Sequence, residues 1–218
     1  VAALGSTRVS NEANYLFQRF MRTVVGCNSV DHLGRMPAGA IALGSLPDLE
    51  DRDAIFLLGT DPSTEAPLVE LRLKKATLRH GARLPVANPR RIELCRYGGP
   101  WLGYRPGSET VLLNGLARAI LDAGLEDPST HASDMDDFQA ALQEYSPGRV
   151  EAETGVSAGS LREAAQVLGQ AANPMLLYGS AWLRGIGVQD DVAGGRSPAP
   201  GLLALENLSL LLGGIEAR

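Results

Sequence analysis

Two hydrophobic patterns alternate along the chain: short continuous apolar runs, and longer stretches in which apolar residues recur every three or four positions. The runs at Val1–Leu4, Ala54–Gly59 and Pro174–Gly179 end at glycine and predict strands. A run that is apolar on both faces is typical of a strand inside a parallel sheet that helices cover. Arg83–Ala87 predicts a further strand, which Pro85 interrupts.

The helical spacing predicts amphipathic helices between these strands. Ser10 is placed to cap a helix that Gly26 ends. One face of this helix would carry its apolar residues, Ala13, Leu16, Phe17, Phe20, Met21, Val24 and Val25. A further helix is predicted from Pro67 through Leu68, Leu71, Lys75 and Leu78 to Gly81. Later helices are predicted with starts at Ser108, Ser133, Ser157 or Ser160, and Gly201.

The order of these elements predicts the fold class. Strands that alternate with helices through short connections form right-handed βαβ units. We therefore expect an α/β fold, a doubly wound and mostly parallel open sheet with helices on both faces, as one domain over residues 1–218. Two stretches, Cys27–Leu49 and Gln189–Gly201, show no periodicity and are expected to be loops.

Composition narrows the function classes. Hydrophobic residues make up 44% of the chain and charged residues 21%, with both signs present, which excludes a disordered chain. The formal net charge of -5 argues against binding to a nucleic-acid backbone. Aromatic residues are only 5%, too few for rows of base-stacking side chains.

The cysteines and histidines do not suggest a metal centre. Cys27 and Cys95 lie far apart, and His32, His80 and His131 fall in separate segments. No spacing typical of a zinc or iron–sulfur site is present, so we expect no metal ligand and no disulfide framework. No apolar run is long enough to cross a bilayer, and a chain that opens on a strand-like Val1 suggests a piece of a longer protein.

Candidate chemistry lies where the predicted strands end, because ligands of open parallel sheets collect at the carboxyl ends of the strands. Three loops follow such ends: Gly59–Asp61, Asn88–Arg91 and Tyr178–Ser180. On residue type alone, the favoured interpretation is that Asp61 and Asn88 cap the helices that follow. Neither a phosphate-binding P-loop motif nor a G-x-G-x-x-G motif follows a strand, and no catalytic residue is predicted.

Several segments, in order, resemble motifs of the molybdopterin oxidoreductase superfamily. Asp53–Pro62 resembles its "D-x-I-L-V-x-G-S-N-P" segment, and Val86–Arg90 stands where the family has "V-x-D-P-R". Pro106–Glu109 stands where it has "P-G-T-D". Further matches occur at Gly5–Leu16, Cys27–Arg35, Pro174–Gly179 and Ala204–Gly213. The resemblance implies the formate dehydrogenase- and DMSO reductase-like central domain, with a nucleotide-binding cleft that involves Gly59, Asp61, Asn88, Arg90 and Glu109.

Three departures from the family motifs indicate which subgroup of the superfamily the chain resembles. The metal ligand of catalytic members would fall near Pro37, which has no donor atom. Asn88 replaces the aspartate of "D-P-R", and Glu109 replaces the aspartate of "P-G-T-D" with a longer carboxylate. Together these are similar to the large iron–sulfur subunit of NADH:quinone oxidoreductase, respiratory complex I.

The resemblance therefore implies a first hypothesis, a non-catalytic scaffold domain of that large iron–sulfur subunit. Its cofactor cleft would be vestigial, its iron–sulfur clusters would lie in preceding domains, and no cofactor would bind here. Its partners would be other subunits of the peripheral arm, without nucleic acid, in the cytoplasm at the inner membrane of a bacterium. The alternative is the pterin-guanine-dinucleotide-binding domain of a molybdenum or tungsten oxidoreductase such as formate dehydrogenase. A free-standing nucleotide-binding module is a third hypothesis.

Overall fold

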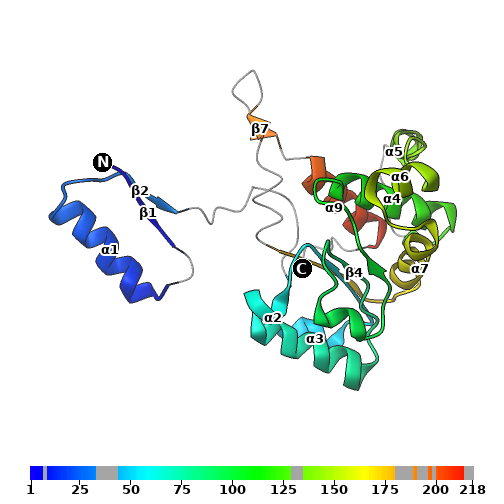
Figure 1. Ribbon diagram of the computed structural model, residues 1–218, viewed down its shortest axis with the longest axis horizontal. Coiled ribbons are helices and arrows are strands. Elements are labelled where there is room, and N and C mark those ends of the chain that lie inside the picture. The colour runs from blue at the N-terminus through cyan, green and yellow to red at the C-terminus, as the bar shows by residue number, and fades with distance from the viewer. Residues whose placement is uncertain are drawn as a thin grey trace. The chain divides into compact units, whose positions relative to one another are not determined.

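The computed structural model of the chain divides into two compact units, Val1–Ala38 and Gly39–Arg218. It describes residues 1–6, 9–32, 44–128, 135–179, 189–190, 196–197 and 200–213. Figure 1 shows both units with their helices and strands. Within the described residues, no helix is both long enough and apolar enough to cross a membrane.

The smaller unit pairs two short parallel strands with one helix. β1 (Ala3–Gly5) pairs with β2 (Val30–His32), and α1 (Asn11–Thr23) connects them. The Ser10 side chain accepts from the Ala13 N–H, which confirms the predicted cap. The predicted apolar face is buried only in part, because Leu16 and Phe20 are exposed. Two three-residue strands cover only a narrow stripe of the helix, so the buried core is limited to Ala3, Met21 and Cys27.

The larger unit contains the main sheet and most of the helices. In chain order its elements are η1 (Pro47–Asp51), β3 (Ala54–Leu58), α2 (Pro62–Glu65), α3 (Pro67–His80), β4 (Val86–Ala87), η2 (Glu93–Arg96), β5 (Trp101–Leu102), α4 (Glu109–Asp122), α5 (Met135–Leu142), α6 (Pro147–Thr154), α7 (Ala158–Gly169), β6 (Pro174–Tyr178), β7 (Gln189–Asp190), β8 (Arg196–Ser197) and α9 (Pro200–Leu211). The segments predicted to be loops therefore contain β2 and η1 in one case, and β7 and β8 in the other. Strands and turns this short leave no periodicity in the sequence.

The main sheet is parallel, with the strand order β5-β4-β3-β6. All five residues of β3 are buried, as expected for an interior strand. β4 is shorter than predicted, since Pro85 has no N–H to donate to the ladder, and Arg83 forms only an isolated bridge with Ala54. β6 is half-buried rather than fully buried, because in the described sheet it forms an edge.

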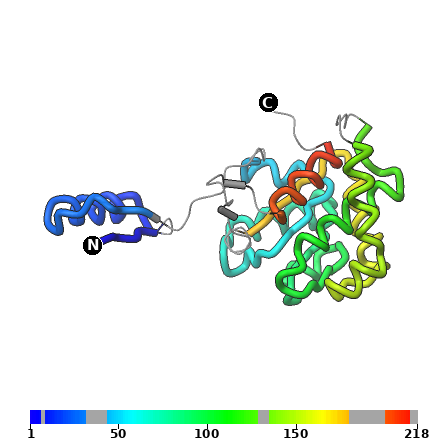
Figure 2. Tube along the Cα trace, turned by 90° about the horizontal axis from the view of Figure 1, so that it is seen from above, coloured from blue at the N-terminus to red at the C-terminus, as the bar shows by residue number. Residues whose placement is uncertain are grey.

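Helices cover both faces of this sheet, as predicted. On one face Phe56 and Leu58 pack in a core with residues of α4, α7 and α9. On the other face Ile55 and Leu57 pack with Leu73 and Ala76 of α3. Figure 1 shows α2 and α3 below the sheet and the larger helical group on its other side. α9 packs beside α4 although the two are far apart in sequence, as the view from above shows (Figure 2).

α3 has the predicted extent, but most of the leucines along it do not face the core. The helix begins at Pro67 and ends at Gly81 in the left-handed region, as the sequence suggested. However, Leu68, Leu71 and Leu78 are exposed, while Leu73 and Ala76 are fully buried. The helix has apolar residues on two sides, so the three-to-four spacing alone could not identify the side that meets the sheet.

Some helix starts differ from the predicted ones. Ser157 caps α7 by accepting from the Ser160 N–H, so Ser160 lies inside the helix. Ser108 precedes α4, but its hydroxyl donates to the Arg105 carbonyl and does not cap the helix. The predicted start at Ser133 lies outside the described residues, whereas α5 itself is present. β5 and α6 were not predicted at all.

Candidate functional site

The loops that follow β3, β4 and β5 lie at one edge of the sheet, because these parallel strands are neighbours. The Asn88 side-chain amide donates to the Thr60 carbonyl oxygen at 3.0 Å, which joins the first two loops. The Asn88 backbone N–H donates to the Leu102 carbonyl at 3.2 Å, which joins the second loop to the third strand. Four of the five predicted site residues, Gly59, Asp61, Asn88 and Arg90, therefore come from joined loops.

Asn88 is buried, and loop structure uses both ends of its side-chain amide. Its Oδ1 accepts from the Arg90 N–H at 2.9 Å while its Nδ2 donates to Thr60. Asparagine commonly forms such local turns through its side chain. One lone pair of Oδ1 and one N–H of Nδ2 remain for a ligand, and neither carries a charge.

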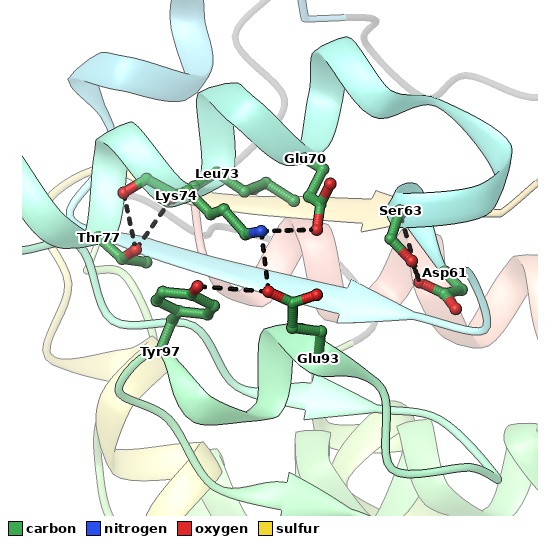
Figure 3. A network of polar contacts seen from close by, with 8 residues as sticks. All are labelled: Asp61, Ser63, Glu70, Leu73, Lys74, Thr77, Glu93 and Tyr97. Atoms are coloured by element: carbon green, nitrogen blue, oxygen red, sulfur yellow. Dashed lines mark hydrogen bonds and ion pairs between the residues drawn. The ribbon is translucent and has the colours of Figure 1, made fainter.

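Asp61 caps α2. Its Oδ1 accepts from the Ser63 N–H at 3.3 Å and from the Ser63 hydroxyl at 2.6 Å. Both residues appear at the arrowhead end of β3 in Figure 3. The neighbouring Thr60 hydroxyl donates to Glu65 Oε2 at 3.1 Å, so this loop is hydrogen-bonded within itself. The capping interpretation is confirmed for Asp61.

Gly59 is required by its backbone. Its φ of +60° lies in the left-handed region, which residues with a side chain rarely adopt. Gly179, at the end of the neighbouring β6, approaches it closely: a Cβ there would lie 2.7 Å from the Gly59 carbonyl oxygen. These two glycines allow the ends of β3 and β6 to pack together, so Gly59 acts through shape rather than through a side chain.

Arg90 and Arg91 are exposed at the tip of the second loop. The Arg91 guanidinium lies over the Trp101 ring, 5.8 Å from its centre. The Trp101 Nε1–H donates to the Asn88 carbonyl oxygen at 3.0 Å, so the ring is attached to this loop while it stays 37% exposed. Sequence reasoning missed Trp101, because it belongs to a two-residue strand; the only available signal was the Gly-Gly-Pro turn before it.

Glu109, the fifth predicted residue, is the first residue of α4 and follows the loop after β5. It forms a hydrogen bond with the buried Tyr104. Burial, and then the negative charge of Glu109, raise the pKa of the Tyr104 phenol. The phenol is thus a fixed donor to the carboxylate. Within the described residues, no hydrogen bond or ion pair joins Glu109 to Asn88 or Arg90.

The edge provides arginine cations and the carboxylates of Asp61 and Glu109 rather than a cluster of metal ligands. No group of three or more His, Cys, Asp or Glu able to hold a metal occurs in the described ranges. Pro37, where the resemblance places the metal ligand, lies outside these ranges, and so does Ser180. The chemistry available here is electrostatic and hydrogen-bonding recognition of a polar ligand.

Comparisons with known proteins match this chain to the same family that the sequence motifs resemble. Residues 1–191 match the sequence profile described as "Molybdopterin oxidoreductase". The chain is 35% identical over 228 residues to the "NADPH-Fe(3+) oxidoreductase subunit alpha" of Geobacter sulfurreducens, which covers 98% of this chain. It is 31% identical over 195 residues, 82% of this chain, to "Formate dehydrogenase H" of Escherichia coli.

Among solved structures, acetylene hydratase from Pelobacter acetylenicus matches 97% of this chain with a TM-score of 0.69 and 21% identity. At this identity the match shows the fold, which agrees with the parallel sheet between helical layers. The chain spans about a quarter of the length of the curated relatives named above, 26% and 27%. It also spans 30% of acetylene hydratase.

Proposed function

Because the chain belongs to the molybdopterin oxidoreductase family, we propose that it is the pterin-guanine-dinucleotide-binding α/β domain of a molybdenum or tungsten oxidoreductase such as a formate dehydrogenase. The observation that carries this proposal is the joined edge of the sheet, where exposed Arg90 and Arg91 follow β4 and Glu109 follows β5. The similarity to oxidoreductases, formate dehydrogenase H among them, supports it.

The residues at this edge fit the nucleotide end of such a cofactor. Guanidinium groups suit phosphate oxygens, and the side chain of Arg90 makes no hydrogen bond or ion pair within the described part of the chain. The Glu109 carboxylate can accept from ribose hydroxyls or from the N–H groups of a guanine ring. Asn88 contributes less than an aspartate would, because its Oδ1 already accepts from Arg90.

In this proposal the bound group supplies the redox chemistry of its metal. The residues of this chain orient the nucleotide: the arginines hold phosphates and Glu109 holds one polar edge of the ribose or base. Tyr104 keeps the Glu109 carboxylate in place through its hydrogen bond. Pro37 has no atom that could bind a metal, so we assign no metal ligand to this chain.

A second candidate is the scaffold domain of the large iron–sulfur subunit of NADH:quinone oxidoreductase. Pro37 and the internally bonded Asn88 favour it, since neither supplies the ligand chemistry that the family resemblance assigns to its position. In that case the cofactor edge is vestigial and the clusters belong to preceding domains. The chain then packs against other subunits of the peripheral arm, on the cytoplasmic side of the membrane.

Titration of the chain with GDP by calorimetry separates the two candidates. For the cofactor-binding domain we expect saturable binding in the micromolar range, with Arg90→Gln and Glu109→Ala each weakening it about tenfold, the value of one charge-assisted hydrogen bond. Arg79→Gln is the matched control, because Arg79 is an exposed arginine of α3 away from this edge. Its affinity should equal that of the unchanged chain.

For the scaffold domain, GDP binding is weaker by about two to four orders of magnitude, since one acceptor is missing and another is displaced. Binding no tighter than millimolar would therefore reject the cofactor-binding function and favour the scaffold. Micromolar binding that Glu109→Ala and Arg90→Gln leave unchanged would mean that the nucleotide binds elsewhere on the chain, and it would reject the site proposed here.

A further inference from the structure

A cavity of about 560 Å³ lies at the opposite edge of the sheet from the candidate site. Its lining includes Arg83, which precedes β4, and Gly98 and Gly99, which precede β5. In Figure 3, Thr77 and Tyr97, which also line the cavity, lie at the end of β3 that is far from Asp61 and Ser63. None of these lining residues has a role in the proposed function.

Two contacts position the backbone and one arginine at the floor of this cavity. Gly99 packs so closely against the preceding strand segment that a Cβ would lie 2.1 Å from the Leu84 carbonyl oxygen. The Arg83 Nε–H donates to the Gly98 carbonyl oxygen at 2.8 Å, which fixes the guanidinium beside the loop. These contacts position the Gly98–Gly99 backbone and the Arg83 guanidinium in the absence of a ligand, which lowers the entropic cost of ordering them on binding.

Unused hydrogen-bond donors gather around this floor. Within the described residues, the backbone N–H groups of Gly98 and Gly99 donate to no acceptor. In the same part of the chain Arg83 donates only through its Nε, so its two terminal nitrogens are available. These are the donor types that hold phosphate and carboxylate oxygens in proteins.

Arg96 adds a second cation to the same cavity. Its charge acts on Glu93, but Lys74 already pairs with that carboxylate at 3.0 Å. Hydrogen bonds from Lys74 and the charges of Lys74 and Arg96 hold the pKa of Glu93 below its ordinary value. The Arg96 side chain makes no hydrogen bond or ion pair of its own in the described part of the chain, and so it can bind a ligand.

We propose that this cavity binds a small oxyanion, a phosphate or carboxylate group, between Arg83, Arg96 and the N–H groups of Gly98 and Gly99. One negative side chain, Glu163 of α7, also lines the cavity. It lowers the affinity through charge repulsion without cancelling two guanidinium groups. The carboxyl end of α3 at Gly81 acts in the same direction, since helix carboxyl ends carry partial negative charge.

The test is an NMR titration of the full chain with inorganic phosphate, with sodium chloride at equal ionic strength as the reference. We expect saturable shifts of the Gly98 and Gly99 amide signals at about millimolar phosphate, and no saturable shift with chloride. A parallel titration with succinate shows whether carboxylates bind as well as phosphate. Saturation of these signals by either oxyanion supports the proposal.

Two substitutions of opposite sign test the assignment. Arg96→Gln should weaken phosphate binding about tenfold, and Glu163→Gln should strengthen it about threefold. Arg162→Gln is the matched control, because Arg162 is an exposed arginine beside Glu163 that does not line the cavity. If Arg96→Gln fails to fold, the strengthening by Glu163→Gln still decides the question.

Three results would overturn the proposal. The first is the absence of saturable shifts at Gly98 and Gly99. The second is phosphate-dependent shifts confined to the Arg90 loop, which would assign the anion to the other edge and leave the proposed function intact. The third is an equal loss of binding in Arg162→Gln and Arg96→Gln, which would indicate a general effect of charge.

Discussion

Polar side chains in the loops at the carboxyl ends of β3 and β4 form hydrogen bonds with backbone groups of those same loops. Asp61 caps α2, and Asn88 holds the turn to Arg90 and the neighbouring loop. Both residues belong to segments that resemble the family's cofactor motifs, and both have structural hydrogen bonds. A residue at a family motif position can thus retain the loop shape while it loses part of its capacity to bind.

Asp53 shows the same behaviour at the other end of β3. Its Oδ2 accepts from the Ala172 N–H at 2.6 Å and its Oδ1 from the Asn173 N–H at 2.9 Å. One carboxylate just before β3 thereby holds the segment that leads into β6, although Ala172 lies 119 positions away in sequence. Residue-scale contacts of this kind align the two strands in register.

We predict that Asp53→Ala lowers the free energy of unfolding by about 1–2 kcal/mol, because two backbone donors lose a charged acceptor at a solvent-exposed site. Denaturant unfolding followed by circular dichroism measures it. Asp51→Ala is the control, since Asp51 is exposed and its side chain accepts no hydrogen bond within the described residues. Equal losses in the two variants would show that Asp53 acts only through its charge.

At the scale of elements, β3 and α3 show when an apolar pattern identifies the core. β3 is apolar at all five positions and buried at all five, so no choice of face arises. α3 has leucines on two sides, and only the side with Leu73 and Ala76 packs with β3 and η1. Lys75 and Arg72 both pair with Glu50 of η1, which contributes to the rotation that α3 adopts.

Leu57→Ala should lower the free energy of unfolding by about 2–5 kcal/mol, since it removes a fully buried side chain and leaves a cavity. Leu78→Ala, at a position that is 70% exposed, is the matched control and should cost less than about 0.5 kcal/mol. Both values come from chemical denaturation. A loss below about 1 kcal/mol for Leu57→Ala would mean that β3 is peripheral and that the strand order is wrong.

At the scale of the whole molecule, the two cysteines belong to different compact units. Cys27 is buried in the smaller unit, where its Sγ–H donates to the Val1 carbonyl oxygen. Cys95 lies on η2 in the larger unit, and burial raises the pKa of its thiol, which disfavours the thiolate that binds metals. Each unit therefore holds a single cysteine, and neither unit can form a disulfide of its own.

We predict that the purified chain, incubated with salts of iron, molybdate or tungstate without a pterin, retains less than stoichiometric metal after gel filtration. The reason is that its cysteines and histidines do not cluster in sequence. Elemental analysis by mass spectrometry measures the ratio. One bound metal per chain would contradict this and would indicate ligands contributed by the segments outside the described residues.

The sequence by itself determined the class of fold and the family. Continuous apolar runs and helical spacing carry that information locally, because burial on both faces of a strand needs no knowledge of the neighbours. The alternation of strands and helices then predicted a parallel sheet with helices on both faces, which the structure confirms. The ordered motifs predicted the family to which the chain belongs.

Tertiary structure alone decided which side of α3 is buried and which residues the site side chains bond to. It also decided that β2 pairs with β1 and that β5 pairs with β4. Strands of two or three residues carry no periodic signal, and a helix that is apolar on two sides does not show which side is buried, so contacts with distant residues decide both. The hydrogen bonds of Asn88 and Trp101 also depend on contacts with residues distant in sequence. Their hydrogen bonds join loops that only the sheet brings together, and the remaining lone pairs and donors follow from that arrangement.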